Sequence, residues 1–403
     1  MGGLQKMKLR RLLDCYFANA ASSIVVAVMF VLLLNTTSIF AALESLLPVP
    51  MVWEQSFGDE QYSYKSEAAI VTSSGMLMAV GTYAPAKNRR APPDGGWIWK
   101  IDGNGKRISD VRFDSSILGS TLAGIDALAL VGDDNVAIVG HLSNGKSFLL
   151  HVNALGKVVK TIDLSSRHIS KLFRMSDGSL MLAGQKNGDM LLMKLDKAGG
   201  IVWEKITDQG KDDALVDGSI SVDRLLLVAL SGKQEQFAMT DSTIGLVKPA
   251  IDGKLDDPIF TIKGRNGSLA RDAKRIMLVY DAAMTSEQDI RFVMLDNALR
   301  VVKEAPITTG KISIERFKVG RAGEIGFIAA GTAGGKMILT FIDTDGQVKW
   351  QHTRLNDNAF FMNPEVVGND SAYVISTMMV LTSEKQPKTL VNILKIDPSA
   401  PKQ

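Results

Sequence analysis

Hydrophobic and polar residues alternate in short runs along most of this chain, and many of the runs end at a turn of the same composition. The repeated unit is an alternating apolar run, an Asp or Asn, two further residues, a Gly, and a second run. It occurs as WIWKIDGNG (97–105), LLHVNALGK (149–157), LLMKLDKAGG (191–200) and LTFIDTDGQ (339–347). Asp and Asn hydrogen-bond to their own backbone in turns, and Gly adopts positive φ without a steric penalty. The unit therefore predicts a β-hairpin.

Three further copies keep the acid but lack the Gly: FAMTDSTIG (237–245), RFVMLDNAL (291–299) and NILKIDPSA (392–400). From Asp102 to Asp397, the seven acid or amide positions are 51, 43, 45, 55, 47 and 54 residues apart, and a short apolar strand precedes each. Four short strands in a repeat of this length are typical of a propeller blade. We therefore predict an all-β fold, a seven-bladed β-propeller, with six or eight blades as alternatives.

The segment MVWEQSF (51–57) predicts how the ring closes. The same tripeptide VWE recurs at 202–204, where it is the return strand of a hairpin. Trp203 and Trp350 each lie seven residues after the acid of their turn, but seven residues after Asp397 would be position 404, beyond the last residue. Trp53 can fill that place. An open ring would expose two sheet edges, so we predict that residues 52–57 pair with residues 391–396. The closure residues are Val52, Trp53, Phe57, Ile393 and Ile396.

The start of the chain has a different composition. A basic stretch with Lys6, Lys8, Arg10 and Arg11 precedes the apolar run IVVAVMFVLLL (24–34) and the segment NTTSIFAA (35–42). This order is typical of a secretory signal peptide, but residues 18–47 are also long enough to form an uncleaved membrane anchor. We expect a signal peptide or anchor over 1–42, the propeller over 51–397 and a tail over 398–403. Either leader delivers the rest of the chain to the periplasm or the outside, with a tether in the inner membrane in the second case.

Charge and cysteine content exclude several functions. The formal net charge is +3, and the four basic residues of the leader against Asp14 account for all of it. The remainder is near neutral without a basic stripe, so we expect no nucleic-acid partner. The only cysteine is Cys15, in the leader. The rest of the chain therefore has no disulfide, no cysteine-ligated zinc and no cysteine nucleophile.

The blade pattern resembles a known group. A strand ending in AG or VG, a KID or KLD turn and then VWE is similar to the exported bacterial β-propellers of the quinoprotein-like or WD40-like superfamily. The resemblance covers residues 52–397 and implies the fold, in a group that includes enzymes and assembly factors. The combination of a Gly-His and a Trp-Asp pair that marks WD repeats is absent, and so is the tryptophan-docking repeat of pyrroloquinoline quinone dehydrogenases. We therefore expect no bound cofactor.

Motifs for catalysis or metal binding are weak. His141, His151, His168 and His352 fall on different strands or blades, so we expect neither a shared metal nor a triad. GTAGGKM (331–337) lacks the spacing and the Ser or Thr of a phosphate loop, and DTDG (343–346) lacks the acid that completes a calcium loop. We expect both segments to be turns between strands.

Two long connections suggest a recognition edge. Residues 82–97 and 378–391 join the second and third strands of the first and seventh blades, which are neighbours across the closure. Loops on rigid scaffolds often carry function, so Arg89, Arg90 and Trp97 are candidate partner-binding residues. We expect a non-enzymatic binding or scaffold module for a protein or polymer partner.

The alternative is a propeller enzyme, namely a lyase, a hydrolase or a quinone-dependent dehydrogenase, with its site at the central channel. An enzyme requires convergent polar groups on the innermost strands. The segments EAAIVTS (67–73), IDALALV (125–131) and ISIERFK (312–318) offer few of them. This observation favours the binding module.

Overall fold

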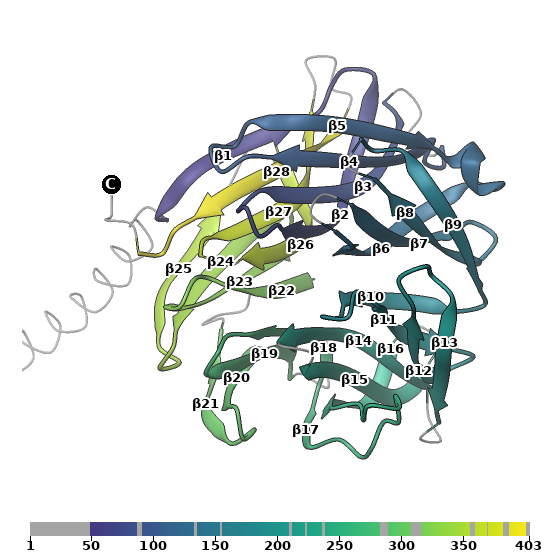
Figure 1. The fold of residues 1–403 in the computed structure, drawn as a ribbon. Helices are drawn as coiled ribbons and strands as arrows, with labels where there is room; N and C mark the ends of the chain where they lie inside the picture. The colour runs from purple at the N-terminus through teal and green to yellow at the C-terminus, as the bar shows by residue number, and fades with distance from the viewer. Residues whose placement is uncertain are drawn as a thin grey trace, which may run out of the picture. The chain divides into compact units, whose positions relative to one another are not determined.

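The computed structural model describes residues 49–86, 91–132, 135–153, 155–208, 212–221, 224–235, 238–282, 289–307, 316–354, 359–368, 370–381 and 387–399. Within these residues, twenty-eight strands form seven four-stranded antiparallel sheets arranged in a ring (Figure 1). The predicted all-β, seven-bladed propeller is therefore confirmed.

The first three blades follow one another along the chain. The first contains β2 (Tyr62–Val71), β3 (Leu77–Pro85), β4 (Gly95–Ile101) and β5 (Arg107–Asp114), followed by the short 3₁₀ helix η1 (Ser115–Leu118). The second contains β6 (Leu122–Leu130), β7 (Val136–Leu142), β8 (Ser147–Val152) and β9 (Val158–Ser165). The third contains β10 (His168–Arg174), β11 (Leu180–Lys186), β12 (Asp189–Leu195) and β13 (Ile201–Thr207).

The remaining blades have the same order from the inside of the ring to its rim. The fourth contains β14 (Asp212–Ser221), β15 (Arg224–Glu235), β16 (Ala238–Val247) and β17 (Phe260–Lys263). The fifth contains β18 (Arg265–Arg271), β19 (Arg275–Asp281), β20 (Ile290–Asp296) and β21 (Val301–Pro306). The sixth contains β22 (Arg316–Arg321), β23 (Gly326–Ala333), β24 (Lys336–Asp343) and β25 (Val348–Arg354). The seventh contains β26 (Ala359–Gly368), β27 (Ala372–Leu381), β28 (Pro387–Ile396) and, from the other end of the chain, β1 (Met51–Phe57).

The hydrophobic core is divided among the interfaces between blades. Seven apolar clusters are present among the described residues, and each joins one pair of neighbouring blades. At one of these interfaces, Met277 and Phe292 of the fifth blade pack with Phe327 of the sixth. Strands alternate their side chains between two faces, so each blade covers one neighbour with each face. A single blade therefore cannot bury its own apolar residues.

The ring closes as the sequence predicts. β1 pairs antiparallel with β28, from Met51 opposite Ile396 to Phe57 opposite Val391. Trp53 stands opposite Lys395, just as Trp203 stands opposite Lys194 in the third blade, and both strands shift register beside the tryptophan. MVWEQSF is therefore the outer strand of the seventh blade.

The tryptophan of the VWE motif joins its blade to the next one. The indole N–H of Trp53 donates to the carbonyl of Gly103 at 2.9 Å, and its ring lies against Gly105 in the turn of the first blade. Trp203 lies in the same way against Gly253 of the fourth blade. Both glycines have positive φ, 84° and 82°, and a Cβ at either would collide with the ring. Glycine is therefore required at these turns for two reasons: the backbone has positive φ, and the tryptophan of the neighbouring blade leaves no room for a Cβ.

The glutamate of the motif joins its blade to the preceding one. Glu54 accepts hydrogen bonds from Arg354, at the end of the sixth blade, and from the buried Asn392 at 2.7 Å. Glu204 accepts from Arg167, which precedes the third blade, and from Lys186, both at 2.6 Å. Each VWE segment thus contacts both neighbours of its blade.

Two segments differ from the sequence prediction. FAMTDSTIG is not a turn, because β16 runs from Ala238 to Val247 and the turn with Asp252 and Gly253 follows it. The connection at 378–391 is mostly strand, since β27 and β28 pair as far as Leu381 opposite Pro387. In both places the hairpin between the second and third strands is longer than the repeat suggests.

The predicted signal peptide or anchor lies outside the described residues. In the described part of the chain, no helix is long and apolar enough to cross a membrane.

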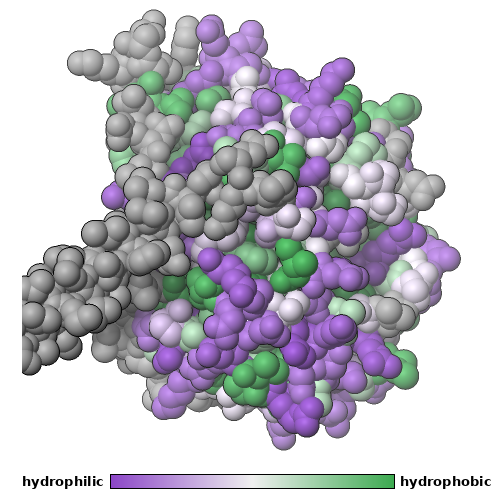
Figure 2. All heavy atoms as spheres, turned by 90° about the vertical axis from the view of Figure 1, so that its left-hand side faces the viewer, coloured by the Kyte–Doolittle hydropathy of each residue, from purple (hydrophilic) through white to green (hydrophobic). Residues whose placement is uncertain are grey.

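The exposed apolar residues on one side of the propeller are scattered. On the side where β1 and β25 lie, hydrophobic residues form separate spots among hydrophilic ones (Figure 2). Exposed apolar side chains such as Val52 and Val348 belong to the outer strands of their blades. Scattered apolar residues of this kind are ordinary on protein surfaces. The described surface on this side is therefore not a broad apolar docking area.

Deletion of residues 51–58 tests the closure. The deletion removes the partner of β28 and the packing of Trp53 and Phe57 against the seventh and first blades. We expect a loss of about 5 kcal/mol or more, which lowers Tm by about 10 °C or more. Thermal unfolding followed by circular dichroism measures this. A truncated chain that melts as cooperatively, and at the same temperature, as the full chain would contradict closure by β1.

Candidate functional site at the channel mouth

The innermost strands carry a local irregularity that the sequence does not reveal. Six of these seven strands, all except β22, shift register against the second strand of their blade within the described residues. A β-bulge of this kind bends a strand and changes the direction of its side chains, and bulges are common near functional sites. The residues left without a pairing partner include Glu67, Asp126, Ser170, Val216, Asn266, Gly267, Asn363 and Pro364.

A cavity of about 430 Å³ opens at one end of the channel. Five blades contribute to its wall, the first, fourth, fifth, sixth and seventh. Its polar lining consists of Glu67, Asn266, Arg316, Lys318, Asn363 and Glu365. Arg316 begins its inner strand and Leu230 lies in the distal half of a second strand. The cavity therefore lies on the face that carries the connections between second and third strands.

A cluster of charges crosses the channel at this cavity and includes two of its lining residues, Lys318 and Glu365. Asp217 of the fourth blade lies 3.1 Å from the ammonium of Lys171 in the third blade and 3.7 Å from that of Lys318 in the sixth. Lys171 also lies 4.0 Å from Glu365 of the seventh blade. The side chain of Asp217 is only 4% exposed. The cluster thus connects four blades around one buried carboxylate.

The pKa of Asp217 reflects these partners. Burial alone would raise the pKa of this carboxyl, but Lys171 and Lys318 lower it, as do hydrogen bonds from the backbone N–H groups of Gly218 and Leu269. The resulting pKa is about 2. Burial would lower the pKa of Lys171, but Asp217 and Glu365 raise it above the ordinary value. Both groups are therefore charged at neutral pH.

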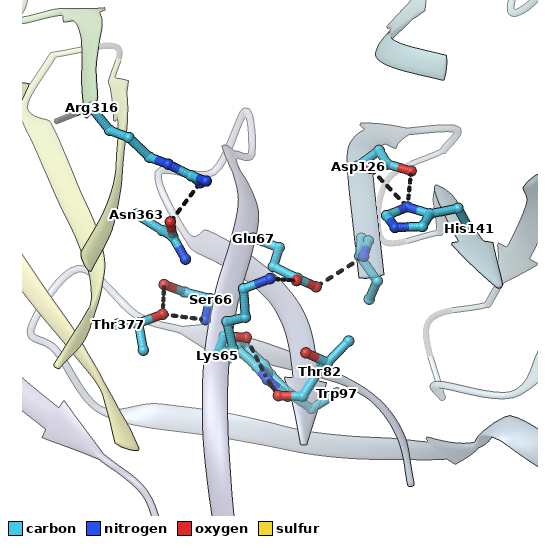
Figure 3. A network of polar contacts seen from close by, with 11 residues as sticks. Lys65, Ser66, Glu67, Thr82, Trp97, Asp126, His141, Arg316, Asn363 and Thr377 are labelled. Carbon is cyan, nitrogen blue, oxygen red and sulfur yellow. Dashed lines mark hydrogen bonds and ion pairs between the residues drawn. The ribbon is translucent and has the colours of Figure 1, made fainter. Parts of the chain in front are cut away.

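A second polar network lies on the side of the first two blades (Figure 3). The carboxylate of Glu67 accepts from the ammonium of Lys65 and, at 2.9 Å, from the backbone N–H of Ile125 in the second blade. Burial raises the pKa of Glu67, and Lys65 opposes that shift. Glu67 thus connects the first blade to the second.

Two of the histidines lie closer together than the sequence suggests. Nδ1 of His141 lies 2.9 Å from the carboxylate of Asp126, and this hydrogen bond raises the pKa of His141 although burial opposes it. The ring centroid of His168, on the next blade, is 6.1 Å from that of His141. The two histidines lie on different strands and blades, as expected, but both stand at the channel-mouth ends of their strands. His151 and His352 lie on β8 and β25.

The sixth and seventh blades meet at a hydrogen bond between Arg316 and Asn363. The guanidinium of Arg316 donates to Oδ1 of Asn363 at 2.6 Å (Figure 3). Arg316 is exposed, and in the described part of the chain no carboxylate forms an ion pair with it. Its neighbour Asn363 is half-buried and has a φ of 50°.

The prediction that the innermost strands carry few polar groups is wrong. Lys65, Lys171, Asp217 and Glu365 lie outside the three segments on which that prediction rested. Strands facing a channel alternate between the core and the channel only until a bulge interrupts them. Charges that look scattered in the sequence therefore converge in the ring.

An apolar groove adjoins the channel mouth. Its volume is about 330 Å³, and it lies between the first and seventh blades. Tyr83 and Pro85 of β3 line one wall, and Met362 and Met379 of the seventh blade line the other. Asn363 lines both the groove and the channel cavity. The two hollows therefore lie next to each other, with Asn363 in the wall of both.

Of the three predicted recognition residues, the structure describes only Trp97. Arg89 and Arg90 lie outside the described residues. Trp97 is fully buried and stacks on Trp99, and its indole N–H donates to the carbonyls of Thr82 and Lys65. Trp97 therefore supports the groove from beneath and does not reach a partner. Its tryptophan identity reflects core packing, which the sequence pattern did not distinguish from an exposed aromatic residue.

The described residues contain no candidate metal site. No group of three or more His, Cys, Asp or Glu side chains has a geometry that could hold a metal ion there.

Comparisons with solved structures agree with the fold. The chain is similar to the polysaccharide lyase Uly1, with 9% identity, a TM-score of 0.56, and coverage of 87% of this chain and 100% of that one. It is also similar to a catalytically inactive variant of virginiamycin B lyase from Staphylococcus aureus, solved with quinupristin. There the identity is 11%, the TM-score 0.53, and the coverage 85% of this chain and 99% of that one.

A third similar structure is the WD40 domain of coronin from Toxoplasma gondii. It has 10% identity, a TM-score of 0.48, and coverage of 89% of this chain and 90% of that one. No protein-family model and no curated protein sequence matches the chain. The predicted structural resemblance is confirmed at the level of the β-propeller fold. The similar structures include both enzymes and binding modules, and at these identities they show the fold alone.

Replacement of Asp217 by Asn tests the buried charge cluster. The change leaves Lys171 and Lys318 without their shared carboxylate, so we expect a loss of about 3 kcal/mol at pH 7. The native pKa lies below the ordinary 3.8. The stability that the charge contributes is therefore present above pH 3.8 and is lost as pH falls toward 2. Urea unfolding of both proteins from pH 7 to pH 2.5 measures the difference.

The matched control is Asp256→Asn, because Asp256 is 68% exposed and pairs with Lys254 on the surface. This control should change stability by less than about 1 kcal/mol. A difference between wild type and Asp217→Asn that is the same at pH 7 and at pH 2.5 would contradict the assignment.

Proposed function

We propose that the protein is a non-enzymatic binding module that holds an extended segment of a partner protein across one face of the propeller. The observation that carries this proposal is that the groove between the first and seventh blades adjoins the channel cavity at Asn363. A chain bound in both hollows would run from the rim of the ring toward its axis. An extended chain fits such a path better than a compact small molecule does.

The lining of the groove supports a peptide as the bound polymer. Tyr83, Pro85, Met362, Met379 and Pro387 offer apolar surface of irregular shape. Methionine adapts to different apolar partners, which suits side chains of varied form. Apolar peptide side chains gain free energy when they enter such a groove.

The state of the channel charges supports binding over catalysis. Asp217 and Glu67 already accept hydrogen bonds from the backbone of neighbouring blades and pair with lysines. Carboxylates used in this way stabilise the ring. We also propose that the module acts after export, on the basis of the leader composition described above, with residues 18–47 as its membrane tether if they are not cleaved.

Replacement of Met379 by Lys tests the groove. A charge placed in the groove should lower the retention of apolar peptides by about tenfold or more, because they would have to displace its hydration. The readout is the fraction of a random, N-acetylated heptapeptide library that the immobilised full chain retains, identified by mass spectrometry. The control is Val159→Lys, at a 60% exposed position on the outer strand β9. Equal retention by wild type and Met379→Lys would rule out the groove as the peptide site.

A second candidate function is an enzyme with its site at the channel mouth. The convergence of Glu67, Asp126 and His141 favours it, because a histidine held by a carboxylate can act in general acid–base catalysis. The cause of the raised His141 pKa, the bond to Asp126, keeps this residue protonated to higher pH than an ordinary histidine. That state suits an acid better than a base.

The two functions differ in the response to His141→Gln. If the channel is catalytic, wild type converts members of a peptide or polysaccharide pool, and His141→Gln lowers the rate by about 100-fold or more. The same variant keeps peptide retention in the groove. If the protein is a binding module, chromatography with mass spectrometry detects retention in both proteins and product in neither.

A further inference from the structure

We propose that Arg316, Asn363 and Asn266 form a clamp for the C-terminal carboxylate of the bound peptide. This inference rests on the proposed function and names the chemical group that the channel end of the site recognises. The three side chains come from the sixth, seventh and fifth blades, which are adjacent, and all three line the channel cavity.

The charge balance of the channel favours one negative charge in the ligand. Lys65 pairs with Glu67, and Lys171 and Lys318 lie near Asp217 and Glu365. These three cations and three anions compensate one another. Arg316 bonds to a neutral amide instead, so among the described residues that line the cavity its positive charge is the surplus. A guanidinium is well suited to bind a carboxylate through two hydrogen bonds.

The backbone of the two asparagines supports a role for their side chains. Asn266 and Asn363 have φ values of 55° and 50°, in the left-handed region, and each lies at a bulge where two residues face one. Glycine adopts this conformation at lower cost, and strained residues of this kind cluster at ligand sites. An asparagine at both positions retains an amide that glycine would lack. The amide N–H groups can donate to carboxylate oxygens.

The position of the clamp favours a chain end over an acidic side chain. The groove leads inward from the rim and reaches the channel cavity at Asn363. Beyond Asn363, the fourth and fifth blades form the far wall of the cavity through Val216 and Gly267. A peptide that runs along the groove would meet this wall, so a terminus fits there without a turn. Apolar side chains would lie in the groove and the free carboxylate at Arg316.

Two heptapeptide libraries test the clamp, one with free C-terminal carboxylates and one with C-terminal amides, both N-acetylated. The full chain should retain the free-carboxylate library about tenfold or more above the amidated one. An amidated peptide cannot form the charge-assisted hydrogen bond that a free carboxylate forms with Arg316. Arg316→Gln and Asn363→Gly should both reduce this preference to near unity. Asn363→Gly keeps the left-handed backbone and removes only the amide, so the variant should fold.

The control is Arg174→Gln, since Arg174 is exposed at the opposite end of the inner strand β10 and should not affect the preference. Equal retention of the two libraries, with loss in Met379→Lys, would overturn the clamp and leave the groove standing. Retention that follows internal Asp or Glu regardless of amidation would also overturn the C-terminal assignment. Retention of neither library would overturn the proposed function together with the clamp.

Discussion

Every feature of this propeller depends on the burial of each blade against two neighbours. Seven apolar interfaces hold the described part of the propeller together, and each of them joins two blades. Since the contribution of each interface grows with the apolar area it removes from water, an open ring would lose one interface outright. The pairing of β1 with β28 prevents that loss. The polar contacts of Trp53 and Glu54 then fix the closing strand to the first and sixth blades, on either side of its own.

Local turn chemistry explains why much of the fold can be read from the sequence. Turns such as 102–105 and 343–346 need an Asp and a Gly at fixed places, and these requirements are independent of the rest of the chain. The closure is predictable for the same reason, because Trp53 repeats the spacing of Trp203. Blade four is where this reasoning fails. Asp241 lies within β16, and a turn with Asp252 and Gly253 replaces the expected one. An acid alone, without its Gly, is weak information about a turn.

The candidate site is less predictable because its contacts join distant parts of the chain. Asp217 meets Lys171, Lys318 and Leu269, which belong to three other blades. Nothing in the local sequence of any of them marks the contact. Bulges add to the difficulty, since a shift of one residue changes the face on which a side chain lies. Trp97 shows the reverse case, in which an aromatic residue beside a long loop is buried by its own blade.

The closure also has a consequence for when β1 can pair during synthesis. β1 precedes the other described strands in the sequence and its partner β28 follows them, so their pairing joins the two ends of the propeller. Contacts between residues so distant in sequence form late, because a long loop must close before they gain anything. The edge of β1 that pairs with β28 therefore stays unpaired until β28 has been synthesised. The ring can close only if the chain has been made as far as β28. A chain that stops earlier keeps an exposed strand edge, which proteases and chaperones can recognise.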